Sequence, residues 1–145
     1  MNVQAQIENY IAGQPQPKRD DLQTLHRMAL AASPNCRLWF LDGRNDAGKV
    51  VTNPNIGYGV QTKRYANGDV KEFYRVGLSA NTSGISVYIM GLSDKKHLSQ
   101  TYGQTLGKAK ITGYCVSFRS LKDVNLGVIE RMVADHLSKE AASVA

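Results

Sequence analysis

The stretch IGYGVQTKRYANGDVKEFYRVGL, residues 56–78, decides the fold of this chain. It contains two runs in which apolar and polar residues alternate, separated by the sequence Ala-Asn-Gly-Asp at residues 66–69. Alternation with period two is typical of a β-strand, and Asn and Gly between two such runs are typical of a hairpin turn. The stretch therefore predicts an antiparallel β-hairpin.

The register of this hairpin depends on the length of its loop. A two-residue loop would mix apolar and bare positions on each face. A three-residue loop with Gly68 in the left-handed conformation pairs Ile56 with Leu78 and gathers the apolar residues on one face. We therefore predict the three-residue loop. The residues then expected to face outward are the odd-numbered ones in 57–63 and 71–77.

Periodicity on either side of the hairpin predicts the other elements. Strands are expected at 36–41, 85–90 and 114–119, and the loop 42–55 has room for a further short strand at Val50-Val51. Helices are expected at 2–12, 20–32, 94–102 and 123–139. The predicted fold class is α+β: a mostly antiparallel sheet of about five strands, with the N-terminal and C-terminal helices packed on one face.

Length and composition predict one intracellular domain spanning residues 1–145. An apolar content of 42% over 145 residues is enough to bury a core. The N-terminus has no signal-peptide pattern, and no apolar window reaches the roughly 20 residues of a membrane span. Cys36 and Cys115 are too few and too far apart for a disulfide framework. We expect a cytoplasmic protein with reduced thiols and no membrane partner.

The net charge of +6 permits anionic partners. The 18 Lys and Arg residues are spread along the chain, however, and no basic run exceeds two residues. Nucleic acid is not the favoured partner, because the sequence shows no recognition helix or clustered basic stripe. A small anion or an acidic protein fits this charge distribution better, and a homodimer is compatible with it.

Nucleotide, metal and nucleophile motifs are incomplete. Gly57-Tyr58-Gly59 lacks the third glycine of a dinucleotide fingerprint, and 103–108 is one residue too short between its glycines for a phosphate loop. The three His residues lie on separate predicted helices without Glu or Cys at ligand spacing, so we expect no metal site and no cofactor. Cys115 is a nucleophile only if a base approaches it in space. Catalysis is therefore not favoured, although an enzyme of unknown type stays open.

The outward face of the hairpin is the candidate binding surface. It alternates basic, glycine and aromatic positions, and neighbouring strands extend it with further hydrogen-bond donors. We expect it to dock the small anion or acidic protein; the alternative is a solvated sheet face. The candidate residues are Lys63, Phe73, Arg75, Tyr88, Ser117 and Arg119.

Several short motifs resemble one known family. They are Ile56-Gly57-Tyr58-Gly59, Tyr65-Ala66-Asn67-Gly68, Val76-Gly77-Leu78-Ser79, Tyr88-Ile89, Leu106-Gly107-Lys108, Gly113 with Cys115, and Leu121 with Asp123-Val124. In order and spacing they resemble the YdhG-like family of bacterial domains of unknown function, whose fold is related in shape to frataxin. The chain departs from that pattern at 80–82, where Ala-Asn-Thr replaces a basic Pro-Arg-Lys segment.

The resemblance implies an α+β fold with helices on a sheet, but little about function. Some relatives are discussed as frataxin-like iron chaperones, which makes iron delivery an alternative function. Iron sites of that kind need clustered carboxylates. The first two predicted helices offer only Glu8, Asp20 and Asp21.

Overall fold

The computed structural model describes residues 2–144, with side-chain burial described through Leu137. Its fold class is α+β, as the sequence predicts, with helices towards both ends of the chain and a sheet between them. The elements are α1 (Val3–Ala12), α2 (Lys18–Ala32), β1 (Leu38–Leu41), β2 (Asn55–Tyr58), β3 (Gln61–Arg64), β4 (Val70–Phe73), β5 (Val76–Asn81), β6 (Gly84–Ile89), α3 (His97–Leu106), β7 (Lys110–Ile111), β8 (Cys115–Phe118), the 3-10 helix η1 (Leu121–Asp123) and α4 (Leu126–Val144).

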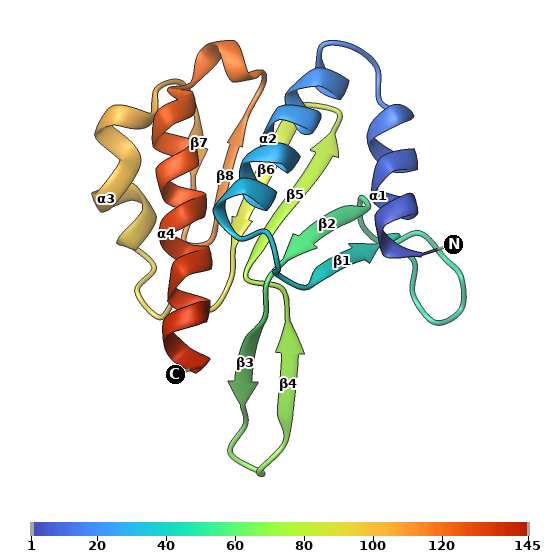
Figure 1. Ribbon diagram of the computed structural model, residues 1–145, viewed down its shortest axis with the longest axis vertical. Coiled ribbons are helices and arrows are strands. Elements are labelled where there is room, and N and C mark those ends of the chain that lie inside the picture. Colours follow the sequence, from blue (N-terminus) through green and yellow to red (C-terminus); the bar gives the residue numbers. More distant parts are fainter. Residues whose placement is uncertain (1, 145) are drawn as a thin grey trace.

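The strands form one six-stranded sheet and one separate two-stranded ribbon. The sheet order is β1-β2-β5-β6-β8-β7, with every neighbouring pair antiparallel. Helices α2 and α4 lie across one face of this sheet, and the ribbon β3-β4 projects from its lower edge (Figure 1). The sequence predicts about five strands because it treats each run of the hairpin as one strand and misses the two-residue β7.

The core lies between the helices and one face of the sheet. Paired strand residues on that face are fully buried, such as Tyr58 with Val76 and Leu78 with Val87. The helices contribute apolar residues at helical spacing, because each turns one face toward the sheet. The most buried of these helix residues are Ile7, Leu22, Leu25, Leu98, Tyr102, Leu106, Ile129 and Met132.

The hairpin has the predicted register. Ile56 pairs with Leu78, and the same register continues through the ribbon. At the tip, the Tyr65 amide donates to the Asp69 carbonyl at 2.9 Å, which leaves a three-residue loop. Gly68 has φ of +91°, in the left-handed region, where a side chain would be strained. The preference for the three-residue loop is therefore confirmed.

The prediction that the odd-numbered residues face outward along the whole of both hairpin strands is wrong. Between the sheet and the ribbon, Gly59 takes a φ of +76°, and neither Tyr74 nor Arg75 belongs to a strand. The Tyr74 ring lies on the face with Gly77 instead of in the core, and the Arg75 Nε donates to the His136 carbonyl of α4 at 3.4 Å. The chain turns at this junction, so the phase of the alternation changes by one residue.

Two helix boundaries also differ from the prediction. The C-terminal helix is expected to start near Asp123, but that residue ends η1. Helix α4 starts at Leu126, where the Asn125 side-chain oxygen accepts from the Gly127 amide at 3.1 Å. Helix α3 covers His97–Leu106 rather than 94–102.

The short strand considered at Val50-Val51 does not form, because Val50 makes only an isolated bridge with Arg44.

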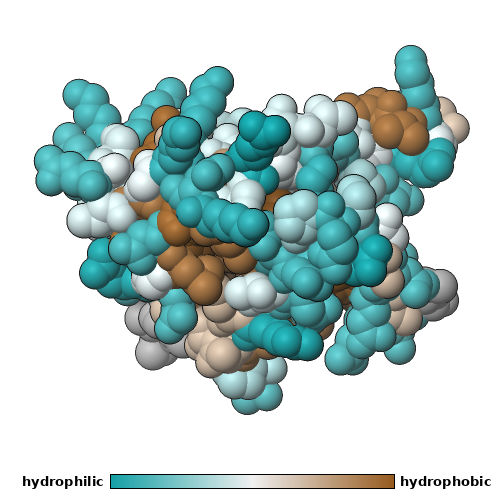
Figure 2. All heavy atoms as spheres, turned by 90° about the horizontal axis from the view of Figure 1, so that it is seen from above, coloured by the Kyte–Doolittle hydropathy of each residue, from teal (hydrophilic) through white to brown (hydrophobic). Residues whose placement is uncertain are grey.

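Apolar side chains are concentrated in this core. Figure 2 shows the molecule from above as mainly hydrophilic, with hydrophobic residues in a zone left of centre and in a smaller patch at the upper right. Within residues 2–144, none of the helices combines the length and the apolarity required to cross a membrane.

Candidate binding face

The sheet face opposite the core, which we call the open face, carries two rows of residues across the strands. Opposed residues of antiparallel strands share a face, so the register assigns each row. Side chains on this face alternate with those that pack against the helices. The first row is Trp39, Gly57, Gly77, Tyr88 and Cys115. The second row is Ser79, Ser86, Ser117 and Lys110.

The two glycines of the first row accommodate the ring of Tyr74. A Cβ added to Gly57 would lie 2.5 Å from Tyr74 Cδ2, and a Cβ added to Gly77 would lie 2.5 Å from Tyr74 Cε1. The ring therefore lies flat against both backbones, and Tyr74 is only 4% exposed. The two glycines thus admit a close neighbour, and that neighbour is a residue of the same hairpin.

Tyr74 belongs to a row of aromatic residues, which we call the aromatic strip: Trp39, Phe73, Tyr74, Tyr88 and Tyr114. Phe73 stacks on Tyr74 with 4.1 Å between ring centroids, and Trp39 meets Phe73 edge-on at 6.0 Å. At the β8 side, Tyr88 and Tyr114 lie within 20° of parallel at 6.3 Å. Tyr114 is 54% exposed, whereas the other rings of the strip are partly or fully buried. The strip thus offers its most accessible ring surface beside β8.

Exposed cations lie around the open face. The Arg37 guanidinium lies 4.0 Å from the centre of the Trp39 ring and forms an ion pair with Glu72 at 3.8 Å. Lys110 stands opposite Ser117 in the second row, and Arg119 follows β8 directly. All three cations are exposed to solvent. The open face therefore combines aromatic surface with positive charge at both sides.

Burial raises the pKa of two phenols and one thiol on the open face. Burial raises the pKa of Tyr74 and Tyr88, so both phenols keep their protons at neutral pH. Burial also raises the pKa of the Cys115 thiol, although hydrogen bonds with Ser86 and Ser117 and the charge of Lys110 act in the opposite direction. A protonated thiol is a poor nucleophile, so this environment does not favour covalent catalysis at Cys115.

The structure brings together some of the sequence-predicted site residues and separates others. Tyr88 and Ser117 lie on the open face, Phe73 stacks on its aromatic strip, and Arg119 lies beside it. Lys63 lies on the projecting ribbon, with its Nζ 5.3 Å from the Tyr65 ring centre. Arg75 extends toward α4. These two cations cannot act with the others as one patch.

Sequence reasoning misses five residues of this face: Arg37, Trp39, Tyr74, Lys110 and Tyr114. Trp39 and Tyr114 are within or next to predicted strands, but their face depends on pairing between strands far apart in sequence. Lys110 belongs to a strand of only two residues, which is too short to give a periodic signal. The pairing of β1, β7 and β8 with their neighbouring strands is the information needed to place Trp39, Lys110 and Tyr114 on this face.

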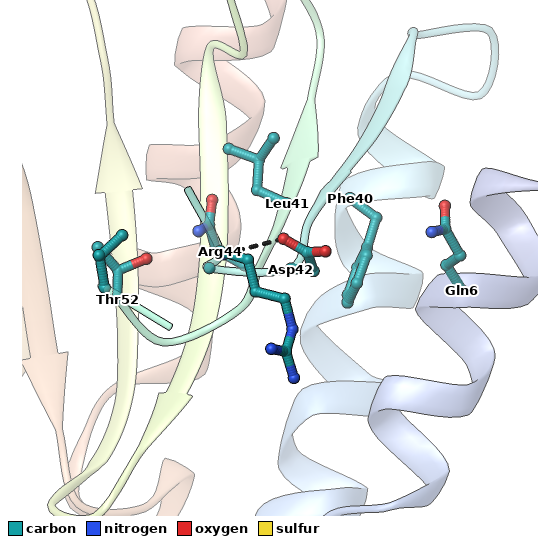
Figure 3. Close-up of a pocket in the computed structure, with 9 residues that line it drawn as sticks. Gln6, Phe40, Leu41, Asp42, Arg44 and Thr52 are labelled. Atoms are coloured by element: carbon teal, nitrogen blue, oxygen red, sulfur yellow. Dashed lines mark hydrogen bonds between the residues drawn. The ribbon is translucent and has the colours of Figure 1, made fainter. Parts of the chain in front are cut away.

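A pocket of about 360 Å³ lies between α1 and the loop that follows β1 (Figure 3). Asp42 and Arg44 line it together, so its charges are mixed. Internal contacts already hold these groups: Asp42 accepts from the Arg44 amide at 2.9 Å, and the Arg44 guanidinium donates to the Gly48 carbonyl at 2.9 Å. The pocket offers an anion less uncompensated positive charge than the open face does.

The part of the chain that the structure describes contains no candidate metal centre. No group of three or more His, Cys, Asp or Glu side chains there is placed to hold an ion. His97 and His136 meet through their Nε2 atoms at 3.2 Å, and His136 Nδ1 lies 2.7 Å from the Met132 carbonyl. These contacts join α3 to α4. Asp21 accepts from the Leu121 amide at 3.1 Å and so has a structural partner.

No family model matches this chain, and comparisons with curated proteins and with solved structures likewise return no match. What the fold and the candidate site define is an α+β domain with helices on one sheet face and an aromatic, cation-bordered opposite face.

Proposed function

We propose that this chain is a non-enzymatic binding domain that docks an anionic partner, a small anion or an acidic protein, against the open face. The observation that carries the proposal is an open face that combines the aromatic strip with the exposed cations Arg37, Lys110 and Arg119 around it. Aromatic residues and Arg are enriched at binding surfaces, where their rings and planar charge provide large contacts.

Charge and shape support this surface over the other candidates. Cations on an aromatic surface attract an anionic partner and orient it, while the rings supply contact area. The pocket beside α1 carries both signs of charge, and the ribbon cations stand away from the strip. We propose in addition that the protein is cytoplasmic and that it belongs to the YdhG-like family. The cytoplasmic location is supported by Cys36 and Cys115, which are free thiols and form no disulfide.

Titration with inorganic phosphate and poly-L-glutamate, followed by calorimetry, tests the proposal. We expect poly-L-glutamate to bind, with an affinity that falls as salt is raised. The double variant Lys110→Glu/Arg119→Glu should lower that affinity at least tenfold. The matched control is Arg27→Glu/Arg131→Glu, which reverses two exposed charges, one on α2 and one on α4. Equal losses in the two variants would show that only net charge matters and would contradict a site on the open face.

A further inference from the structure

We infer that the open face binds single-stranded RNA, with bases stacked on the accessible rings of the aromatic strip, above all Tyr114, and phosphates held by Arg37, Lys110 and Arg119. This inference rests on the proposed function in placing an anionic partner on the open face, and it gives that partner a chemical class other than a small anion or an acidic protein. It starts from the arrangement of the rings: the strip crosses the strands from β1 to β8 instead of forming one compact cluster. Four strand spacings of about 4.8 Å make this path about 19 Å long.

Stacking is the interaction that this strip provides best. Bases splayed from a single strand stack on aromatic side chains, and an antiparallel sheet is a rigid platform for them. Tyr114 is 54% exposed and lies nearly parallel to Tyr88, so a base can cover its free surface without rearrangement of the sheet. An acidic peptide would use the cations and gain contact area from the rings, but it has no planar base to stack on Tyr114.

The polar groups around the strip fit a sugar-phosphate backbone. Arg37 stands at the β1 end and Lys110 at the β7 end, so positive charge is available at both ends of the path. The Ser117 hydroxyl lies in the adjacent row and is partly exposed. A hydroxyl can donate to or accept from a ribose 2′-hydroxyl, the group that distinguishes RNA from DNA.

A sheet platform also removes the sequence-based objection to nucleic acid. That objection concerns recognition helices and clustered basic stripes, which are used to read duplexes. Binding a single strand on a sheet requires neither, because the rings supply much of the affinity and a few cations follow the backbone. The net charge of +6 favours the approach of an anionic chain.

Fluorescence anisotropy with a labelled ten-nucleotide oligouridylate tests this inference on the full chain. We expect binding that weakens as salt is raised, is at least threefold tighter than for oligothymidylate, and is at least tenfold tighter than for a ten-base-pair duplex. Trp39 is the single tryptophan of the chain, so quenching of its emission reports contact at the strip. Equal or tighter binding of the duplex, or no binding of oligouridylate at low salt, would overturn the inference.

Variants separate stacking from charge. Tyr114→Ala should weaken oligouridylate binding about tenfold, within the range expected for losing one stacked base, and Tyr114→Phe should retain it. The matched control is Tyr65→Ala, which removes an exposed aromatic ring from the ribbon. Unchanged binding in Tyr114→Ala, or an equal loss in Tyr65→Ala, would contradict stacking on this strip.

The same measurements distinguish failure of this inference from failure of the proposed function. If poly-L-glutamate binds and responds to Lys110→Glu/Arg119→Glu while oligouridylate does not bind, the partner is an acidic protein and only the RNA inference falls. If neither probe binds, both the proposed function and the RNA inference are contradicted.

Discussion

The ring of Tyr74 lies against the backbone of Gly77 on the open face, so close that a Cβ on the glycine would be 2.5 Å from the ring. Gly77→Ala should therefore destabilise the fold by about 1–3 kcal/mol, because the buried ring or the strand must move. In a Tyr74→Ala background the same substitution should cost close to nothing. Urea denaturation of the four proteins in a double-mutant cycle measures this coupling. Additive effects would show that the ring does not occupy the space above Gly77.

Gly103 provides the matched control for that cycle. It lies within α3, and the nearest atom to an added Cβ is Ile111 Cδ1 at 3.7 Å, an ordinary contact. Gly103→Ala should stabilise the protein by up to about 1 kcal/mol, because alanine has the higher helix propensity. Urea denaturation checks the sign, and a destabilisation would indicate that this turn of α3 is packed more tightly than the structure shows.

His26 should make stability depend on pH. Its imidazole Nδ1 is hydrogen-bonded to the fully buried Tyr58 hydroxyl, and burial lowers the pKa of His26 below its ordinary 6.5, against the opposing charge of Glu8. The unfolded chain then binds more protons than the folded chain as the pH falls below about 6.5, so the free energy of unfolding should decrease between pH 7 and pH 5. Thermal denaturation across this range should show a smaller decrease in His26→Gln. An identical pH dependence in the two proteins would contradict this role of His26.

The Cys115 thiol should react slowly with alkylating reagents at neutral pH. Burial raises its pKa, so little thiolate is present to react. In a Cys36→Ala background, the rate of iodoacetamide labelling should rise with pH to a midpoint above that of an ordinary thiol. Cys115→Ser should also retain poly-L-glutamate binding. A midpoint near or below pH 7 would instead indicate an activated thiol and reopen catalysis.

The ribbon and the open face should respond differently to charge reversal. Lys63→Glu changes a cation on the projecting ribbon and should alter probe affinity less than twofold, whereas Lys110→Glu should lower it at least fivefold. Calorimetry with poly-L-glutamate at one salt concentration compares the two. Similar losses would mean that the ribbon takes part in binding.

The hairpin shows how much of this fold the sequence can predict. Its register follows from local information, the alternation of apolar residues and a Gly that accepts a positive φ, and that prediction is confirmed. The change of phase at Tyr74 and Arg75 cannot be found in the same way, because period-two patterning assumes a continuous strand. The ring of Tyr74 gains burial over two glycines, a tertiary effect that outweighs the local pattern.

The candidate site is less predictable than the fold. Tyr88 and Ser117 are found because they alternate with obvious core residues of their strands. Trp39 joins the same face only through the pairing of β1 with β2 across a long loop, and Lys110 only through a strand of two residues that gives no periodic signal. A surface assembled from five strands depends on their order, and that order is not encoded by any single segment.

The measurement that tests the central claim most directly is a map of amide chemical shifts during titration with oligouridylate and, separately, with poly-L-glutamate. The account predicts shifts confined to residues 37–39, 73–77, 86–88 and 110–119, with little change on the solvent side of α2 and α4. Shifts centred on those helices, or on the tip of the ribbon near residues 65–70, would show that the open face is not the binding surface.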